Sequence, residues 1–590
     1  MLRSQCSKMR SDTPSGADEM RMLSPNQFLR CGKPGAVLLS VLLFQVPVLG
    51  AADSPPAAAI ASAHPLATRA GLETLKRGGN AFDAAVTVSA ALAVVEPYSS
   101  GIGGGGFWLL HRASDGKQVM VDGREKAPGA AYKRMYLDDK DNVRESASLE
   151  GPLAAGIPGL IAGLAHLAEH YGRLPLSQSL EPAVRLAREG FPANQSYRDM
   201  AGFRLKTLQK FPETARIFLA GNGVPELGQP IIQEDLGNLL EQVGAKGAGY
   251  FYQGSFAKLL VDGVRAGGGI WSPEDLQNYN VVERAPIVTD YRGIRVVSAP
   301  PPSSGGIVLV QALEILEHED LEGVDHITRM HVIIEAMRRA YRDRAVYLGD
   351  PDFVTIPTER LLAPDYLEGL ALTIDPKHAT PSVELGDTPN LTQRGENTSH
   401  FSLIDAEGNR VAGTLSINLP FGAVFVPPGT GVLLNDEMDD FSVKANTPNA
   451  YGLVGDQANA VAANKRPLSS MTPTFVETAD RVGILGTPGG SRIVSMVLLG
   501  VLDFAAGNGP ESWVKVRRYH HQYLPDEVQF EPYGLVPYEQ EELRKFGHSL
   551  KQISYSYGDM HAVMWDRKNN QVFAASDPRG EGKAALLPKQ

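Results

Sequence analysis

Apolar residues recur at helical spacing through much of the first 400 residues. Residues 65–97 predict two helices separated by Gly78 and Gly79, and the second is rich in Ala and Val, as a buried helix is. Two apolar runs around the polar turn 113–117 then predict a β-hairpin. Residues 152–400 show mainly helical spacing, and within them 380–397 are polar and rich in turn-forming residues, which is typical of an exposed loop or linker.

After residue 398 the pattern changes to alternating strands. Residues 399–418, 472–486 and 561–576 each predict a hairpin, and we expect the last of these to close the chain. An apolar helix is predicted over 492–505, directly after a Gly-Gly turn. Hairpins imply antiparallel sheets, and helices before and after them imply layers that cover the sheets. The pattern therefore favours a layered α+β protein.

The N-terminal segment has the layout of a secretion signal. Arg30 and Lys33 precede an apolar run from residue 36 to 49, and small residues follow at 50–52. The run is short for a membrane span, although an uncleaved anchor stays open, and translation could start at Met20 or Met22. We predict that residues 1–50 are a signal peptide with an extended N-terminal region. The mature protein is expected to be exported, periplasmic or secreted, with no stable membrane span.

Composition and charge exclude several classes of protein. The chain has 590 residues and a net charge of −11, and its Lys and Arg residues are dispersed, so a nucleic-acid partner is not expected. Both cysteines, Cys6 and Cys31, precede the apolar run. The mature chain would contain none, which excludes disulfides, zinc–thiolate sites and a cysteine nucleophile.

Motifs for cofactors and metals are weak. The run "GIGGGG" at 101–106 fits G-x-G-x-x-G, but the element predicted before it is a helix and the one after it a hairpin, the wrong context for a dinucleotide. The acidic run 137–143 lacks the glycine and the closing glutamate of a calcium loop. The chain contains neither H-E-x-x-H nor G-x-S-x-G. We predict no metal and no organic cofactor.

A hydroxyl cluster, "NTSH" at 397–400, begins the hairpin at 399–418. An internal threonine has no adjoining base, but cleavage of the Asn397–Thr398 bond would give Thr398 a free α-amino group beside its own hydroxyl. An α-amine titrates near ~8, so it can accept a proton at working pH. This arrangement is the N-terminal threonine form of an activated nucleophile. We therefore predict an autocatalytic cut between Asn397 and Thr398.

The hairpin should place polar groups opposite this threonine. With a turn at 407–409, the cross-strand partner of Thr398 is predicted near 417 or 418. Ser416 and Asn418 share one face of the strand by its two-residue period, so both could hydrogen-bond Thr398.

Six segments resemble the γ-glutamyltransferase (γ-glutamyl transpeptidase) family of N-terminal-nucleophile hydrolases, in family order and across the chain after the leader. They are "GIGGGGF", "VDGREKAP", "TSHFSLID", "GVLLNDEMDDFS", "NKRPLSSMTPTF" and "GTPGGSR". The resemblance implies a four-layer αββα sandwich with two antiparallel sheets. It also implies a large subunit of residues 51–397 and a small catalytic subunit of residues 398–590, which together form one unit.

The resemblance assigns roles to specific residues. Thr398 is the expected nucleophile and N-terminus of the small subunit, and Gly489 and Gly490 are the expected oxyanion-binding amides. The residues expected to position Thr398 and assist processing are Thr414, Ser416 (a frequent threonine in the family) and Asn418. Those expected to bind substrate are Arg124, Ser469 and Ser470 at the α-carboxylate, Asp440 and Glu437 (glutamine in some relatives) at the α-ammonium, and Tyr451 as a lid.

The implied activity is transfer of a γ-glutamyl group from glutathione or a related donor, through an ester on Thr398, to water or to an amino acid or peptide acceptor. The planar fork of Arg124 suits a carboxylate, and the amides at the start of a helix suit an oxyanion. Two alternatives stay open. One is an acylase of the same superfamily that removes glutaryl side chains from cephalosporins, and the other is an exported protein that binds γ-glutamyl peptides without turnover.

Overall fold

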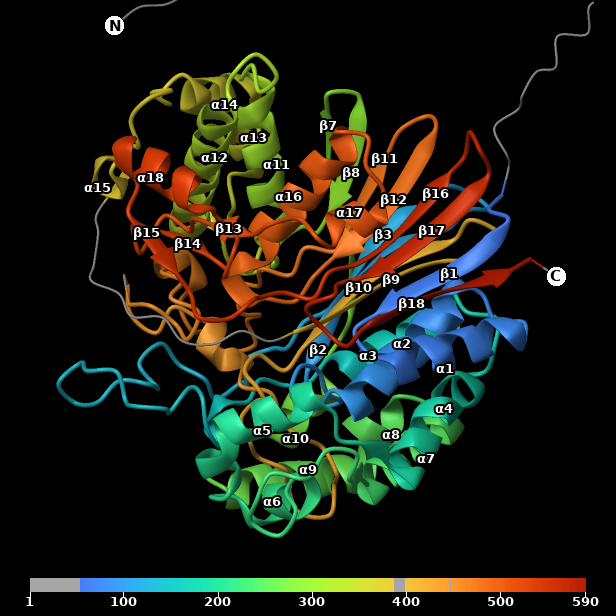
Figure 1. Ribbon diagram of the computed structural model, residues 1–590. Coiled ribbons are helices and arrows are strands. Elements are labelled where there is room, and N and C mark those ends of the chain that lie inside the picture. The colour runs from blue at the N-terminus through green and yellow to red at the C-terminus, as the bar shows by residue number, and fades with distance from the viewer. Residues whose placement is uncertain (1–53, 387–397, 446, 590) are drawn as a thin grey trace, which may run out of the picture. The chain divides into compact units, whose positions relative to one another are not determined.

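The computed structural model describes residues 54–386, 398–445 and 447–589. The predicted leader with Cys6 and Cys31, the cleavage residue Asn397, and most of the predicted linker lie outside these ranges. Two large antiparallel sheets lie face to face between two helical layers (Figure 1). The predicted αββα fold class is confirmed.

The first sheet has seven strands and combines segments from distant parts of the chain. In spatial order they are β18 (Lys583–Pro588), β1 (Ala57–Ser62), β9 (Ser399–Ile404), β10 (Arg410–Ser416), β2 (Gly105–His111), β3 (Gln118–Gly123) and β6 (Val282–Arg284). β9 therefore lies in the interior of the sheet, paired to β1 on one side and to β10 on the other.

The second sheet has six strands and packs against the first. In order they are β17 (Gln571–Ser576), β16 (His561–Asp566), β12 (Arg481–Gly486), β11 (Thr474–Glu477), β8 (Ile294–Ser298) and β7 (Ile287–Tyr291). The hairpins predicted at 399–418, 472–486 and 561–576 are β9–β10, β11–β12 and β16–β17. The last hairpin does not close the chain, because β18 follows it and pairs with β1.

Alternation along the strands explains the layers. In β2, Trp108 and Leu110 face the first helical layer, whereas Phe107 and Leu109 face the second sheet. Side chains on a strand alternate between its two faces, so each strand of the first sheet contributes to two separate cores. A strand buried on both faces is expected to be mainly apolar, as β2 is, whereas β9 and β10 also carry buried polar residues.

The first helical layer covers the outer face of the seven-stranded sheet (Figure 1). Its helices are α1 (Pro65–Lys76), α2 (Ala81–Val95), α3 (Leu160–His170), α4 (Leu176–Glu189), α5 (Gln195–Leu208), α6 (Pro212–Phe218), α7 (Glu234–Lys246), α8 (Gly249–Tyr252), α9 (Gly254–Ala266) and α10 (Pro273–Gln277). Asn80 caps α2 through the amides of Phe82 and Asp83, so the predicted break at Gly78–Gly79 is confirmed. A small sheet, β4 (Phe191–Pro192) with β5 (Pro230–Ile231), lies among these helices.

The second helical layer covers the other sheet. Its members are α11 (Gly305–Glu317), α12 (His326–Tyr347), α13 (Thr358–Leu361), α14 (Pro364–Ala371), α15 (Ser382–Leu385), α16 (Ile493–Ala505), α17 (Pro510–Trp513) and α18 (Pro537–Lys545). A small sheet of β13 (Tyr519–His520), β14 (Val528–Phe530) and β15 (Leu550–Gln552) flanks them. Among the described residues, no helix is both long enough and apolar enough to cross a bilayer.

Candidate active site

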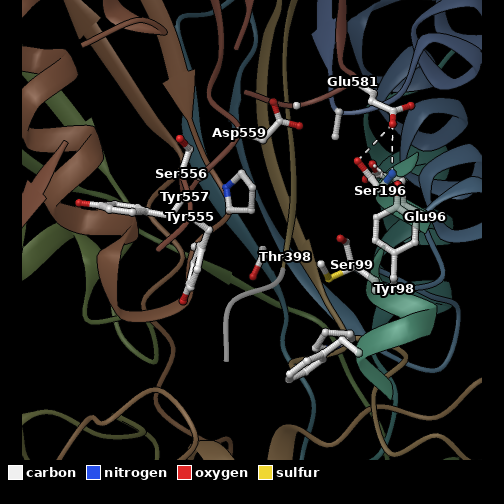
Figure 2. Close-up of a pocket in the computed structure, with 18 residues that line it drawn as sticks. Glu96, Tyr98, Ser99, Ser196, Thr398, Tyr555, Ser556, Tyr557, Asp559 and Glu581 are labelled. Atoms are coloured by element: carbon white, nitrogen blue, oxygen red, sulfur yellow. Dashed lines mark hydrogen bonds between the residues drawn. The ribbon is translucent and has the colours of Figure 1, made fainter. Parts of the chain in front are cut away.

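Thr398 directly precedes β9, at the edge where the two sheets and the first helical layer meet. Its side chain is buried, and it borders two hollows. One, here called the small pocket, has a volume of about 20 Å³. The other, here called the large cavity, has a volume of about 600 Å³ and is drawn in Figure 2. The Thr398 hydroxyl therefore lies where a ligand could place one group in each hollow.

The small pocket unites most of the residues predicted for the site. Beside Thr398 it is lined by Arg124, Ser416, Asn418, Glu437, Asp440, Tyr451, Ser469, Ser470 and Gly490. These residues come from segments separated by more than three hundred positions, and most of them lie in loops or 3₁₀ turns that the fold brings together. Thr414 and Gly489 do not line this pocket.

The register of the hairpin differs from the predicted one. β9 and β10 pair Ser399 with Leu415, so the position opposite Thr398 is Ser416 and not 417 or 418. The cause is the turn, which is a five-residue loop between Ile404 and Arg410. The carboxylate of Asp405 holds this loop by accepting from the backbone amide of Asn409 at 3.0 Å.

Ser416 and Asn418 are held in place beside Thr398. The Asn418 amide donates to Ser416 Oγ at 2.8 Å, and Asn418 Nδ2 donates to the carbonyl of Asp436 at 3.0 Å. Asn418 has a φ of +73°, a left-handed conformation that asparagine tolerates better than most residues. Tyr451 closes over this turn by donating its hydroxyl to the Asn418 carbonyl at 2.9 Å. Thr414, in contrast, is hydrogen-bonded to Nδ1 of His400 at 2.9 Å.

Arg124 lies at the base of the small pocket, surrounded by carboxylates. Its guanidinium donates to Glu437, to Asp440 Oδ2 at 2.5 Å and to Glu125 Oε2 at 3.4 Å. The arginine is 1 % exposed. A second buried arginine, Arg344, donates to Ser470 Oγ at 3.2 Å, and its charge acts on Asp440. Three carboxyl groups thus face two guanidinium groups, and the carboxyl groups outnumber the cations in a buried site.

The pKa values of these groups reflect that imbalance. Burial raises the pKa of Glu437 to about 7, and it also raises the pKa values of Glu125 and Asp440. Burial opposes the charge on Arg124, but the carboxylates of Glu437, Glu125 and Asp440 hold the pKa of the guanidinium above its ordinary value. Oε1 of Glu125 is buried without a hydrogen-bond partner among the described residues. The site can therefore accept an added cation.

The glycines predicted to bind an oxyanion lie on either side of the nucleophile. Gly489 borders the large cavity and Gly490 the small pocket, and Thr398 borders both. Their φ angles are +138° and +55°, and a Cβ at Gly490 would lie 2.3 Å from the Tyr451 ring. A 3₁₀ turn, Gly490–Arg492, then leads into α16. Free amides at the start of a helix are suited to bind negative charge.

The geometry has counterparts among known proteins. The gamma-glutamyltranspeptidase family model matches residues 67–587. A glutathione hydrolase proenzyme from Pseudomonas sp. (strain A14) is 43% identical over 526 residues, covering 87% of this chain and 90% of that protein. The chain belongs to the gamma-glutamyltranspeptidase family. A glutathione hydrolase proenzyme from Escherichia coli (strain K12) is 40% identical and covers 88% of this chain and 90% of its own length.

Solved structures agree with membership of the gamma-glutamyltranspeptidase family and with its fold. Cephalosporin acylase from Bacillus halodurans aligns with a TM-score of 0.77 and 26% identity, covering 96% of this chain and 99% of that one. A Helicobacter pylori gamma-glutamyltranspeptidase chain aligns with a TM-score of 0.53 and 40% identity, covering 55% of this chain and 93% of that one.

Several residues near Thr398 and Arg124 were not predicted from the sequence. Glu125 stands inside the quoted segment "VDGREKAP", where a charge next to Arg124 was the available signal. Glu96 directly follows the apolar helix α2, and a carboxylate at the end of a buried helix was a signal too. Asp559 and Glu581 lie in loops on either side of the β16–β17 hairpin, and no sequence pattern connects them with Thr398.

Glu96 is tied to the strand that begins at the nucleophile. Ser399 Oγ donates to Glu96 Oε2 at 2.6 Å, and the Tyr98 hydroxyl lies 3.3 Å from Oε1. Burial raises the pKa of Glu96 from 4.5 to about 7. Between pH 4.5 and about pH 7, Glu96 keeps its proton in the folded state, whereas in the unfolded state it has lost it. The stability contributed by this group is therefore complete below pH 4.5 and is lost as the pH rises to about 7.

We therefore expect Glu96→Gln to gain stability relative to the unsubstituted protein as pH rises from 5 to 8. The shift corresponds to about 3 kcal/mol, which is a few degrees in melting temperature for a chain of this size. Melting curves at both pH values measure this, and Glu511→Gln, at a carboxylate that is 84% exposed, is the matched control. An equal temperature difference at pH 5 and pH 8 would contradict the buried, protonated state of Glu96.

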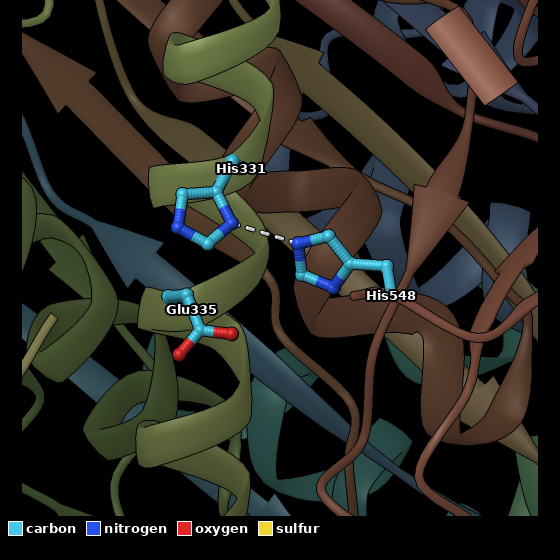
Figure 3. A group of neighbouring side chains, drawn as sticks. All are labelled: His331, Glu335 and His548. Carbon is cyan, nitrogen blue, oxygen red and sulfur yellow. Dashed lines mark hydrogen bonds between the residues drawn. The ribbon is translucent and has the colours of Figure 1, made fainter. Parts of the chain in front are cut away.

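One buried cluster in this gamma-glutamyltranspeptidase chain has the residue types of a metal site: His331 and Glu335 of α12 with His548 (Figure 3). Their contacts with the rest of the protein account for most of their polar atoms, although Nδ1 of His548 is buried without a hydrogen-bond partner among the described residues. His331 Nδ1 is 2.8 Å from His548 Nε2, and His331 Nε2 is 2.7 Å from the Asp375 carbonyl. Glu335 accepts from two arginines, Arg338 and Arg339, at 3.0 and 2.6 Å. The cluster ties α12 to the loop after α18.

Proposed function

We propose that the protein is an autoprocessing γ-glutamyltransferase and glutathione hydrolase. The observation that carries the proposal is the buried Thr398 beside a pocket that holds Arg124, Glu437 and Asp440. Family membership supports the same activity. In this proposal, processing between Asn397 and Thr398 yields a large subunit of residues 51–397 and a small subunit of residues 398–590.

The charges of the small pocket suit the amino acid end of a γ-glutamyl group. That end carries one carboxylate and one ammonium. The carboxylate would be bound by Arg124 with Ser469 and Ser470, and the ammonium by Asp440 and Glu437. Binding would exchange the ion pairs within the protein for two pairs with the substrate, and the substrate ammonium would add a cation beside the carboxyl groups around Arg124.

The reaction would follow from the position of Thr398. Its hydroxyl attacks the γ-amide carbon, and its own α-amino group accepts the proton and passes it to the leaving amine. The amides of Gly489 and Gly490 stabilise the oxyanion, while Ser416 and Asn418 hold the nucleophile. With glutathione the leaving group is cysteinylglycine. Water or an amine acceptor then cleaves the γ-glutamyl ester on Thr398.

A second candidate is an acylase that removes glutaryl groups, favoured by the similarity to the Bacillus halodurans cephalosporin acylase. A glutaryl group has no α-ammonium, so it would occupy Arg124 with its carboxylate and bring no cation of its own to Glu437 and Asp440. We expect turnover of γ-glutamyl-p-nitroanilide to exceed that of glutaryl-p-nitroanilide by about 100-fold, the effect of one or two charge-assisted hydrogen bonds.

Kinetics with the two anilides at equal concentration decides between the candidates. A preference for the glutaryl compound would establish the acylase. A third outcome is a protein that releases nitroaniline from neither anilide, migrates as one uncut chain and still binds γ-glutamyl peptides. That outcome would establish the binding protein instead. N-terminal sequencing of the smaller fragment should give Thr398 as its first residue. The first residue of the larger fragment should lie near residue 51, directly after the site where the leader is removed.

A further inference from the structure

The large cavity contains a second set of charges, which donor binding in the small pocket does not use. Figure 2 shows Thr398 between Tyr555, Ser556 and Tyr557 on one side and Glu96, Tyr98 and Ser99 on the other. The volume of the large cavity, about 600 Å³, lies within the range of sites that enclose small organic ligands. Because Gly489 and Thr398 both border it, a molecule in this cavity reaches the acyl carbon from the side opposite the small pocket.

The acidic side chains that line this cavity are three carboxyl groups, of which buried Glu96 keeps its proton up to about pH 7. Glu96 comes from the end of α2, Asp559 from the loop before β16, and Glu581 from the loop before β18. Neither Lys nor Arg occurs among the described residues that line it. Two nearby arginines are already paired: Arg518 with Asp577, and Arg579 with Asp577 and with Glu531 at 2.6 Å. Two carboxylates therefore compensate the two guanidinium charges.

Two of these carboxylates have capacity for a further donor. Oδ1 of Asp559 is buried without a hydrogen-bond partner among the described residues, and its Oδ2 lies 3.3 Å from His561 Nε2. Oε1 of Glu581 accepts from the amide and the hydroxyl of Ser196 at 3.1 and 3.3 Å, which fixes the carboxylate at the wall (Figure 2).

The remaining wall of the cavity is apolar and aromatic. Met200 and Phe203 of α5 line it, and so does Tyr555 from the loop before β16. Phe203 is 64% exposed and Tyr555 48%, so these rings stand at its opening. Aromatic faces attract cations, and an apolar wall suits an alkyl stem.

We propose that the large cavity is an acceptor subsite that selects amines with a positive charge at their far end, such as alkyl diamines, over acceptors that carry a carboxylate. The inference rests on the proposed function. One amino group lies at the acyl carbon, the alkyl stem follows the apolar wall, and the distant ammonium pairs with Asp559 and Glu581. A leaving group that ends in a carboxylate is repelled by the same charges, which promotes its exchange for a cation.

The transfer step balances without any added reactant. The neutral amine nitrogen attacks the carbonyl carbon of the γ-glutamyl ester, so a C–N bond forms and the bond from that carbon to Thr398 Oγ breaks. The proton lost by the amine passes through the Thr398 α-amino group to Thr398 Oγ. The products are a γ-glutamyl amide and the free threonine.

The test compares three acceptors on one five-carbon stem with γ-glutamyl-p-nitroanilide as donor. 1,5-Diaminopentane ends in a cation, N-acetyl-1,5-diaminopentane in a neutral amide, and 6-aminohexanoate in an anion. We expect kcat/KM for acceptor transfer to fall in that order, with the diamine at least about tenfold above the anion, which is the scale of one charge-assisted contact. Equal use of the three, or preference for the anion, overturns the inference.

Asp559→Asn and Glu581→Gln should each reduce the preference for the diamine over its acetylated form by about fivefold, the upper range for a partly exposed ion pair. Glu511→Gln, which removes an equal charge from the exposed face of α17, should leave the preference unchanged. Hydrolysis of the anilide without acceptor normalises each variant. If the unsubstituted protein hydrolyses the anilide but shows no preference among the three acceptors, only the acceptor subsite is overturned. If it does not hydrolyse the anilide at all, the proposed function is overturned as well.

Discussion

Thr398→Ala is expected to remain a single uncut chain and to lose γ-glutamyl transfer and hydrolysis by about 10⁴-fold or more, the scale for removal of a nucleophile. The variant lacks the hydroxyl that would attack the upstream carbonyl and, later, the substrate. Alanine adds no bulk at this buried position, so the fold should persist. Denaturing electrophoresis and anilide turnover measure the two effects separately.

Thr398→Ser is the matched control, because serine keeps the hydroxyl and would expose the same α-amine after cleavage. We expect two fragments and measurable turnover from it. If Thr398→Ala were cut at the same bond, or if it released nitroaniline at the rate of the serine variant, Thr398 would not be the nucleophile.

Arg124→Lys is expected to raise KM for γ-glutamyl donors roughly 10- to 100-fold, with a smaller change in kcat. Lysine keeps the charge that the surrounding carboxylates need, but it cannot present two parallel N–H groups to a carboxylate. The loss corresponds to one charge-assisted hydrogen bond. Steady-state kinetics over a range of donor concentrations separates KM from kcat.

Arg410→Lys provides the comparison for this substitution. Arg410 is also buried and also pairs with a carboxylate, Glu477 at 2.6 Å, but it begins β10 at the end away from Thr398. The Arg410→Lys substitution should lower the melting temperature without altering KM for the donor. An unchanged KM in Arg124→Lys, or an equal rise in both variants, would exclude a donor-binding role for Arg124.

Local patterns were enough to predict several elements and a layered α+β protein, whereas the four-layer arrangement came from the family resemblance. The Gly78–Gly79 break, the three hairpins and the helix after Gly490 depend on spacing and turn residues that neighbours in the sequence specify. β18 was missed because residues 583–588 have strand character only through pairing with β1, which is more than 500 positions away. The register of β9 and β10 was wrong because the length of the turn at 405–409 depends on the Asp405 side chain.

The site was predictable only in part, for a similar reason. The resemblance named Arg124, Glu437 and Asp440 individually, and the structure places all three beside Thr398. The third carboxyl group at Arg124, Glu125, and the burial that raises the pKa values of all three do not follow from a motif. Asp559 and Glu581 reach the large cavity only through the packing of the second sheet against the first, so no local pattern marks them.

The interior position of β9 limits how this molecule can be made. β9 begins at Ser399, next to the proposed cut, and its backbone is paired to β1 and β10 on both sides. Its neighbours β1 and β2 precede the cut and β10 follows it, so neither fragment contains a complete sheet on its own. If the cut falls where we propose, the chain must fold before it is severed. Enzyme melted after that cut would lack the covalent connection that guided its first assembly, so we expect its heat inactivation to be irreversible.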